Sequence, residues 1–244
     1  MSLNDQLGDC TCAGAAHVAQ QILFYGQGKN APVADDDVLK MYEAVGHYVP
    51  GDPSTDQGAT LQDALNYWRK TGVGGHKIVA FAQLDASDLE TIRACVDLFG
   101  AVYTGFNVPK SAMDQFNAGK PWTVVKRSPI EGGHCVPIGA YDAKTFSCVT
   151  WGAVQKMDIA FLTTYFDEFW VPISLDWLSA QGVSPGALDA ATLNADYKEL
   201  TGQAGPFPVT PAPSPTPSPT PAPASDADAT LVAAFKAWVT AKGL

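Results

Sequence analysis

Helical and strand patterns occupy different halves of this chain of 244 residues. Before Gly119, apolar residues recur mainly at the three- and four-residue spacing of amphipathic helices, with two short strand-like runs between them. After Gly119 they form short runs bounded by turn residues, which is typical of paired strands. This order predicts an α+β fold made of a helical subdomain and an antiparallel β subdomain. The expected helices cover residues 10–25, 36–46, 60–68, 87–98, 111–117 and 157–166, and the expected strands cover 77–81, 101–106, 135–141, 146–151 and 169–173.

The composition changes near residue 205. Residues 206–225 are almost entirely Pro, Thr, Ser and Ala, which form an extended spacer and no core. Residues 226–244 carry apolar side chains on one face of an amphipathic helix, and a lone helix of that length is marginal in water. The sequence therefore predicts a domain over 1–205, a linker over 206–225 and a C-terminal helix over 226–244 that needs a partner surface on the domain or on another molecule.

The charge balance limits the kinds of partner. The chain has 15 Lys and Arg against 25 Asp and Glu, a formal net charge of −10. Nucleic acids and anionic membranes both attract basic surfaces. No apolar run reaches the roughly 20 residues of a membrane span. We therefore expect neither nucleic-acid binding nor a membrane span.

The cysteines point to free thiols. Their number is five, which cannot pair completely within one chain, and none has the spacing of a zinc site. We expect reduced thiols, no metal and no cofactor. Reduced thiols favour the cytoplasm, whereas the Pro/Thr spacer favours a secreted or virion protein, so the location stays open. The five are Cys10, Cys12, Cys95, Cys135 and Cys148.

Cys10 stands at the start of the first expected helix, in the string Asn-Asp-Gln-Leu-Gly-Asp-Cys-Thr of residues 4–11. Unpaired backbone N–H groups and the helix dipole favour negative charge there. Such a position is expected to lower the pKa of the thiol and to produce the nucleophilic thiolate. His134 ends a Gly-Gly-His string that enters an expected strand, and it can act as the base of a Cys–His pair. The two strings together predict hydrolysis by a cysteine nucleophile.

These strings resemble the active-site segments of the papain-like cysteine peptidases, in their bacterial and phage branch. Members of that branch read Gln-Gly-Gln-Leu-Gly-Ser-Cys-Thr, where the Cys is the nucleophile and the Gln six residues before it helps to form the oxyanion hole. A second family string, Gly-Gly-His-Ala-Val, carries the general base. The resemblance covers about residues 4–175 and implies Cys10 as nucleophile, His134 as base and Asn4 as oxyanion donor, in a cleft between the two subdomains. Family sequences continue upstream of this string, so we expect the natural chain to do the same.

The first departure from the family pattern is Asn4, which stands where the family has Gln. Asn carries the same amide donor on a stem one methylene shorter. A competing register pairs Gln6 with Cys12, which are also six residues apart. The Leu-Gly-acid-Cys-Thr context fits only Cys10, so we prefer that register.

The second departure concerns the residue that orients the histidine. The family's Asn-Ser-Trp-Gly string corresponds here to the strand that ends in Val149-Thr150-Trp151-Gly152. The orienting Asn is replaced by Val149 or by Thr150, and only Thr150 can accept a hydrogen bond from the imidazole. The resemblance therefore implies Thr150 as a weaker third member.

The expected activity is hydrolysis of peptide bonds in a peptide or protein substrate through an acyl-enzyme. Two alternatives stay open. The missing Asn and the shorter amide favour a catalytically weak or inactive papain-like scaffold that serves as a phage or cell-surface structural or binding protein. The same Cys–His chemistry would also suit isopeptide or peptidoglycan amide bonds.

Overall fold

The computed structural model describes residues 2–201 and 204–209. The contacts in it divide the chain into two units, Met1–Trp177 and Leu178–Leu244. The predicted linker over 206–225 is described only as far as residue 209, and the predicted helix over 226–244 lies outside the described residues. The boundaries of the domain over 1–205 and of these two segments therefore stay predictions.

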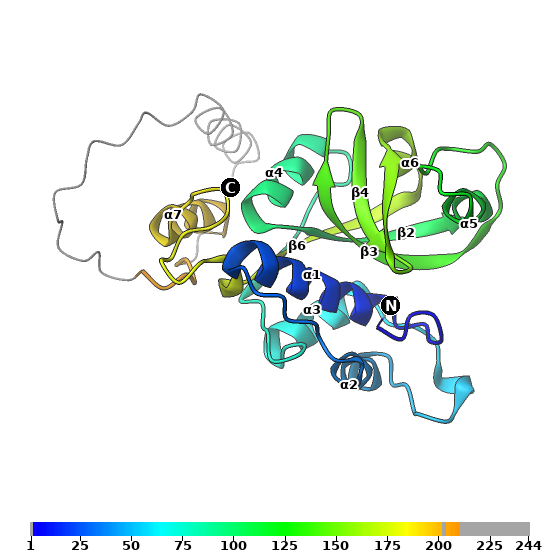
Figure 1. Ribbon diagram of the computed structural model, residues 1–244, viewed down its shortest axis with the longest axis horizontal. Helices are drawn as coiled ribbons and strands as arrows, with labels where there is room; N and C mark the ends of the chain where they lie inside the picture. Colours follow the sequence, from blue (N-terminus) through cyan, green and yellow to red (C-terminus); the bar gives the residue numbers. More distant parts are fainter. Residues whose placement is uncertain (1, 202–203, 210–244) are drawn as a thin grey trace. The chain divides into compact units, whose positions relative to one another are not determined.

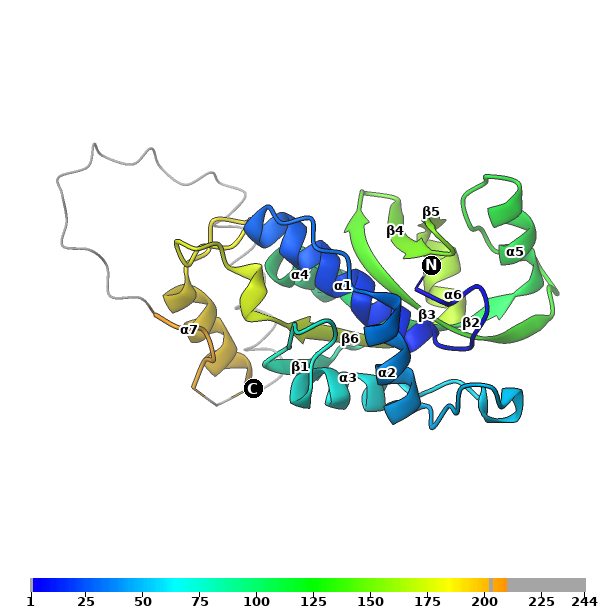
Figure 2. The ribbon, with the colours of Figure 1, turned by 60° about the horizontal axis from the view of Figure 1, so that its bottom comes forward.

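Three helices form the helical part of the first unit: α1 (Cys10–Gln27), α2 (Asp35–Val45) and α3 (Leu61–Lys70). Thr60 caps α3, because its side chain accepts a hydrogen bond from the N–H of Asp63 at 3.1 Å. In Figures 1 and 2, α1 lies between the sheet and the pair α2 and α3. The apolar faces of the three helices share one core, which includes Ala15, Val18, Ile22, Val38, Met41, Tyr42, Ala64, Leu65 and Trp68.

The strands of the described residues form one six-stranded sheet of order β1-β6-β2-β3-β4-β5, in which every neighbouring pair is antiparallel. The predicted α+β class with an antiparallel β part is confirmed. β1 and β2 come from the helix-rich half of the sequence and join strands from the second half. The bounds are β1 (Ala80–Gln83), β2 (Val102–Pro109), β3 (Ile130–Tyr141), β4 (Thr145–Thr150), β5 (Ala153–Asp158) and β6 (Phe166–Ile173).

The helix expected over 157–166 is too long at both ends. Met157 belongs to β5 and pairs with Phe146, and Phe166 begins β6. Asp158 sets the start of the intervening helix by accepting a hydrogen bond from the N–H of Phe161 at 2.7 Å. The remaining helices of the first unit are α4 (Leu89–Phe99), α5 (Lys110–Asn117), α6 (Ile159–Tyr165) and the 3₁₀ turns Pro53–Thr55 and Leu175–Trp177.

The start of α1 approaches the sheet closely at Gly14. A Cβ at this position would lie 3.1 Å from the ring of Tyr103 and 3.2 Å from the sulfur of Cys135. The hydroxyl of Tyr103, on β2, donates a hydrogen bond to the carbonyl oxygen of Thr11 at 2.6 Å. The small residue and this hydrogen bond together fix the first turns of α1 against β2 and β3.

The second unit contains α7 (Ala190–Thr201). The side chain of Asn194 accepts a hydrogen bond from the N–H of Phe207 at 2.9 Å and donates one to its carbonyl oxygen at 2.8 Å. No helix formed by the described residues is long and apolar enough to cross a membrane. In the same residues, no group of three or more His, Cys, Asp or Glu side chains could hold a metal ion.

Candidate active site

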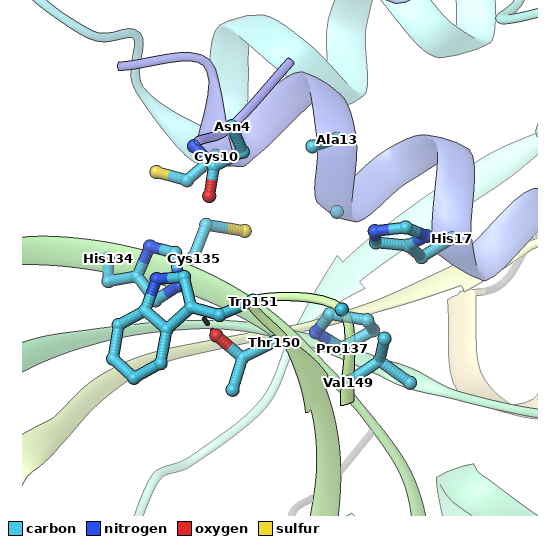
Figure 3. A pocket seen from close by; sticks show the side chains of 12 residues that line it. Asn4, Cys10, Ala13, His17, His134, Cys135, Pro137, Val149, Thr150 and Trp151 are labelled. Atoms are coloured by element: carbon cyan, nitrogen blue, oxygen red, sulfur yellow. Dashed lines mark hydrogen bonds between the residues drawn. The ribbon is translucent and has the colours of Figure 1, made fainter. Parts of the chain in front are cut away.

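A groove of about 850 Å³ contains both Cys10 and His134 in its lining. Cys10 is the first residue of α1, and His134 lies on β3. The helical part contributes the chain around Cys10 and the loop before α3, and the sheet contributes parts of β2, β3 and β6. A small pocket of about 10 Å³ lies beside the groove and is lined by the same two residues (Figure 3). The fold therefore brings together two side chains that the sequence analysis paired.

The thiol of Cys10 is partly buried, and this burial raises its pKa above the ordinary value. The N–H of Cys135 lowers the pKa, the charge of Asp9 raises it, and the N–H of Thr11 lowers it. The sequence analysis expected a lowered pKa from the helix N-terminus. That expectation is wrong for the structure described here, because desolvation outweighs the favourable N–H groups.

The ring of His134 is held between polar and aromatic neighbours. Its Nε2 lies 2.9 Å from Oγ1 of Thr150. The indole of Trp151 stacks on the ring with centroids 5.1 Å apart and an angle of 10° between the planes. Phe106, the cross-strand partner of His134 on β2, meets the ring edge to face at 5.9 Å. Burial lowers the pKa of His134 to about 4, so the imidazole is neutral at physiological pH.

A tight turn presents Thr150 and Trp151 to the ring. β4 and β5 are joined by Trp151 and Gly152, which have φ values of 44° and 76°. Two successive residues at positive φ are the mark of a two-residue hairpin turn of type I′. Aromatic residues seldom adopt this backbone conformation. Because Trp151 does so, its ring lies over His134. Figure 3 shows the indole of Trp151 overlapping the imidazole and a dashed line from the ring to the hydroxyl of Thr150.

Asn4, the predicted oxyanion donor, lines both the groove and the small pocket. Its amide nitrogen donates to the carbonyl oxygen of Leu7 at 3.2 Å and to Oδ1 of Asp9 at 3.1 Å. An amide has two N–H bonds, so both are engaged within the N-terminal segment. The oxyanion role of Asn4 therefore stays a prediction that requires one of these bonds to be exchanged.

Cys12, the nucleophile of the competing register, is buried in the core between α1 and its neighbours, with 0% of its surface exposed. It is absent from the lining of the groove, and its partner in that register, Gln6, is exposed to solvent. Cys135 does line the groove but is only 4% exposed, and burial raises its pKa well above the ordinary value. The geometry favours Cys10 among the three.

The carboxylate of Asp56 joins the N-terminal segment to the loop before α3, a role that the sequence analysis missed. Its two oxygens accept hydrogen bonds from the N–H of Gly8 at 2.9 and 3.2 Å, and one of them also accepts from the hydroxyl of Tyr42. That hydroxyl accepts in turn from the N–H of Gly58 at 2.9 Å. The wall of the groove next to Cys10 is thus held by one carboxylate. An Asp before a Gln-Gly pair gives no sequence signal for such a long-range contact.

Acidic side chains supply the charge of the groove. Asp56, Asp167 and Glu168 line it, and no Lys or Arg among the described residues does so. Asp167 accepts a hydrogen bond from Asn107 at 2.9 Å, and Oε1 of Glu168 accepts one from the indole of Trp170 at 2.6 Å. The groove therefore favours positively charged groups.

Comparison with known proteins finds similarity in structure alone. No family model matches the sequence, and no curated protein matches it. Xylellain, a cysteine protease from Xylella fastidiosa, superposes with a TM-score of 0.55 at 18% identity, over 69% of this chain and 80% of that one. The cysteine protease CMS1MS2 of Carica candamarcensis gives 0.51 at 10% identity, over 69% and 89%. Bromelain of Ananas comosus gives 0.50 at 11% identity, over 70% and 91%.

Proposed function

Because this chain has the papain-like fold, we propose that it is a thiol-dependent peptidase with Cys10 as nucleophile and His134 as general base. The observation that carries the proposal is that these two residues, remote in sequence, line one groove with Thr150 in contact with the ring. The strings around them also favour the bacterial and phage branch of the family.

The proposed first step uses the ring nitrogen that Thr150 leaves free. In the neutral tautomer with hydrogen on Nε2, this N–H donates to the hydroxyl of Thr150. Nδ1 then has its lone pair directed away from Thr150 and accepts the proton of the Cys10 thiol. The sulfur attacks the scissile carbonyl, and the imidazolium returns the proton to the leaving amine. Water hydrolyses the resulting thioester with His134 again as base, which restores the thiol.

The pKa directions favour a neutral resting pair. The pKa of Cys10 is raised and that of His134 is lowered to about 4, so thiol and imidazole are both uncharged before substrate binds. Proton transfer from Cys10 to His134 therefore accompanies the attack on the carbonyl. The developing oxyanion would be met by the N–H of Cys10 at the start of α1 and by the amide of Asn4, once that amide releases Leu7 or Asp9.

The acidic groove supports a substrate class. Three carboxylates with no Lys or Arg beside them in the described lining favour peptides that carry Lys or Arg near the scissile bond. The formal net charge of −10 adds long-range attraction for such substrates.

The scaffold alternative is supported by two observations. The group in contact with the ring is a threonine hydroxyl, where the family string has an Asn amide, and both N–H bonds of Asn4 are engaged. In this alternative the groove binds a peptide without cleaving it. Substrate profiling would distinguish cleavage of isopeptide or peptidoglycan amide bonds from cleavage of ordinary peptide bonds.

The proposal is tested by hydrolysis of a library of unfolded protein fragments, read by mass spectrometry. Cys10→Ala and His134→Ala should each abolish cleavage, while circular dichroism shows that the fold persists. Cys95→Ala removes a buried thiol that does not line the groove and should leave cleavage unchanged. A thioester adduct on Cys10, trapped by acid quenching, would support the peptidase. Full activity of Cys10→Ala would overturn it, and binding without cleavage by the natural chain would favour the scaffold.

A further inference from the structure

Asp9, the residue before Cys10, has a buried carboxyl group with 0% of its surface exposed. It occupies the N-cap position of α1, but its side chain makes no capping hydrogen bond. Oδ1 accepts a hydrogen bond from Asn4 at 3.1 Å. Oδ2 is also buried and has no hydrogen-bond partner among the described residues. A buried carboxylate oxygen without a partner is far more costly than a buried neutral hydroxyl, so the site favours the protonated acid.

The neighbours of Asp9 add to this preference. Among the described residues, no Lys or Arg forms an ion pair with it. The negative charges of Asp56 and Asp35 both disfavour its ionisation, after the larger effect of burial. The titratable groups that face it are Asp35 and Tyr42 on α2, Asp56 in the loop before α3, and Cys10 and Cys12 on α1.

We propose that Asp9 is a positioning residue that controls how readily Cys10 becomes a thiolate. When its carboxyl is protonated, Asp9 accepts the hydrogen bond of Asn4 beside the groove. It then adds no negative charge near Cys10, so a thiolate on Cys10 meets no repulsion from it. Without its proton, the carboxylate opposes the thiolate on the neighbouring residue. The inference rests on the proposed role of Cys10.

The physical basis is the cost of two adjacent negative charges in a poorly solvated place. Each charge disfavours the other, so the two groups titrate as a coupled pair. Burial raises the pKa of Asp9 to about 7, and the charge of Asp9 raises the pKa of Cys10. Below neutral pH the carboxyl is uncharged and does not oppose the thiolate. Above neutral pH it ionises first, and thiolate formation moves to still higher pH.

The test measures the thiolate of Cys10 without relying on hydrolysis. The rate of carbamidomethylation of Cys10 by iodoacetamide is followed by mass spectrometry of its peptide, from about pH 5 to about pH 9. Asp9→Asn keeps an oxygen that accepts from Asn4 but cannot ionise. We expect Asp9→Asn to react about three to ten times faster than the natural chain near pH 8, and equally fast near pH 5.5.

The matched control is Asp5→Asn, which removes the same charge from an exposed side chain in the same segment. In this control variant, Cys10 should be alkylated at the same rate as in the natural chain at every pH. Asp9→Ser, whose hydroxyl is also uncharged and can accept from Asn4, repeats the test should Asp9→Asn fail to fold. Equal alkylation of the natural chain and of the folded Asp9 variant near pH 8 would overturn the inference.

Parallel peptide hydrolysis by the same proteins separates the two proposals. If the natural chain cleaves no peptide but Asp9→Asn still accelerates alkylation, the peptidase proposal fails and the coupling of Asp9 to Cys10 stands. If the natural chain cleaves peptides and Asp9→Asn changes neither the alkylation rate nor the pH profile of kcat, the coupling fails and the peptidase proposal stands.

Discussion

Oγ1 of Thr150 lies 2.9 Å from Nε2 of His134, so a threonine hydroxyl is in direct contact with the ring. Thr150 is 4% exposed and ends β4, so its hydroxyl is fixed by the sheet and does not depend on a mobile loop. A short β-branched side chain held by a strand can therefore orient the ring.

Removal of this hydroxyl should lower the rate of hydrolysis. Thr150→Val keeps the shape of the side chain but leaves Nε2–H of His134 without an acceptor, so the ring loses its fixed orientation. We expect kcat to fall by about tenfold to a hundredfold with little change in KM. Thr150→Ser retains the hydroxyl and should keep most of the rate. Equal kcat values for the Val and Ser variants would show that the contact does not orient the base.

Trp151 should set the basicity of His134. Its indole covers one face of the ring, and burial is the cause of the low pKa of about 4. Trp151→Ala admits water to that face, so the pKa of His134 should rise toward the ordinary value near 6.5. Titration of the imidazole proton resonances by NMR measures the pKa of His134. Val154→Ala, an exposed change on β5, is the control and should leave the pKa near 4.

Asp9 and His134 should give opposite dependences of stability on pH. The folded pKa of Asp9 is raised, so its contribution to the free energy of unfolding is present below about pH 4 and is lost as pH rises to about 7. The folded pKa of His134 is lowered, so its contribution grows between about pH 4 and 6.5. By linkage, the contribution of Asp9 to the free energy of unfolding changes by about 4 kcal/mol and that of His134 by about 3 kcal/mol. The two changes have opposite signs and largely cancel.

Single variants should reveal each of these two dependences of stability on pH separately. Relative to the natural chain, Asp9→Asn should gain stability steadily as pH rises from about 4 to 7, and His134→Ala should lose it from about 4 to 6.5. Urea unfolding at a series of pH values measures both differences. A difference between Asp9→Asn and the natural chain that is constant over this range would mean that Asp9 ionises normally in the folded protein.

Glu168 should select for positively charged side chains. It lines the groove and lies across from Gly105 in the sheet, where a Cβ would lie 3.6 Å from Oε2 of Glu168. Glu168→Gln should raise KM for peptides with Lys or Arg by about tenfold and leave neutral peptides unaffected. Asp167→Asn removes a more exposed charge and should change KM by less than about threefold. An equal loss for charged and neutral peptides would assign Glu168 a role in packing alone.

The sequence was a good guide where local patterns determine structure. The start of α1 at Cys10, the cap at Thr60 and the hairpin of β3 and β4 depend on periodicity and on turn residues close by in the chain. β5 was missed because residues 153–158 alternate weakly, and this strand is specified by pairing with β4.

The candidate site, too, could be predicted from the sequence only in part. Cys10 and His134 were predicted from short strings, and Thr150 from the resemblance of its strand to a family string. Their electrostatics could not be found, since the pKa of each group depends on burial by residues that are distant in sequence. Asp9 directly precedes α1, which is the position of a helix cap, and such a position gives no sign of burial. Its burial accompanies the hydrogen bonds of Asn4 with Asp9 and of Asp56 with Gly8, and no local pattern predicts either bond.

The neutral resting state of the Cys10 thiol has a consequence for the durability of the protein. Peroxide and other oxidants attack the thiolate far faster than the thiol. A sulfur that stays protonated is therefore slow to form sulfenic acid, so Cys10 should resist oxidation in air.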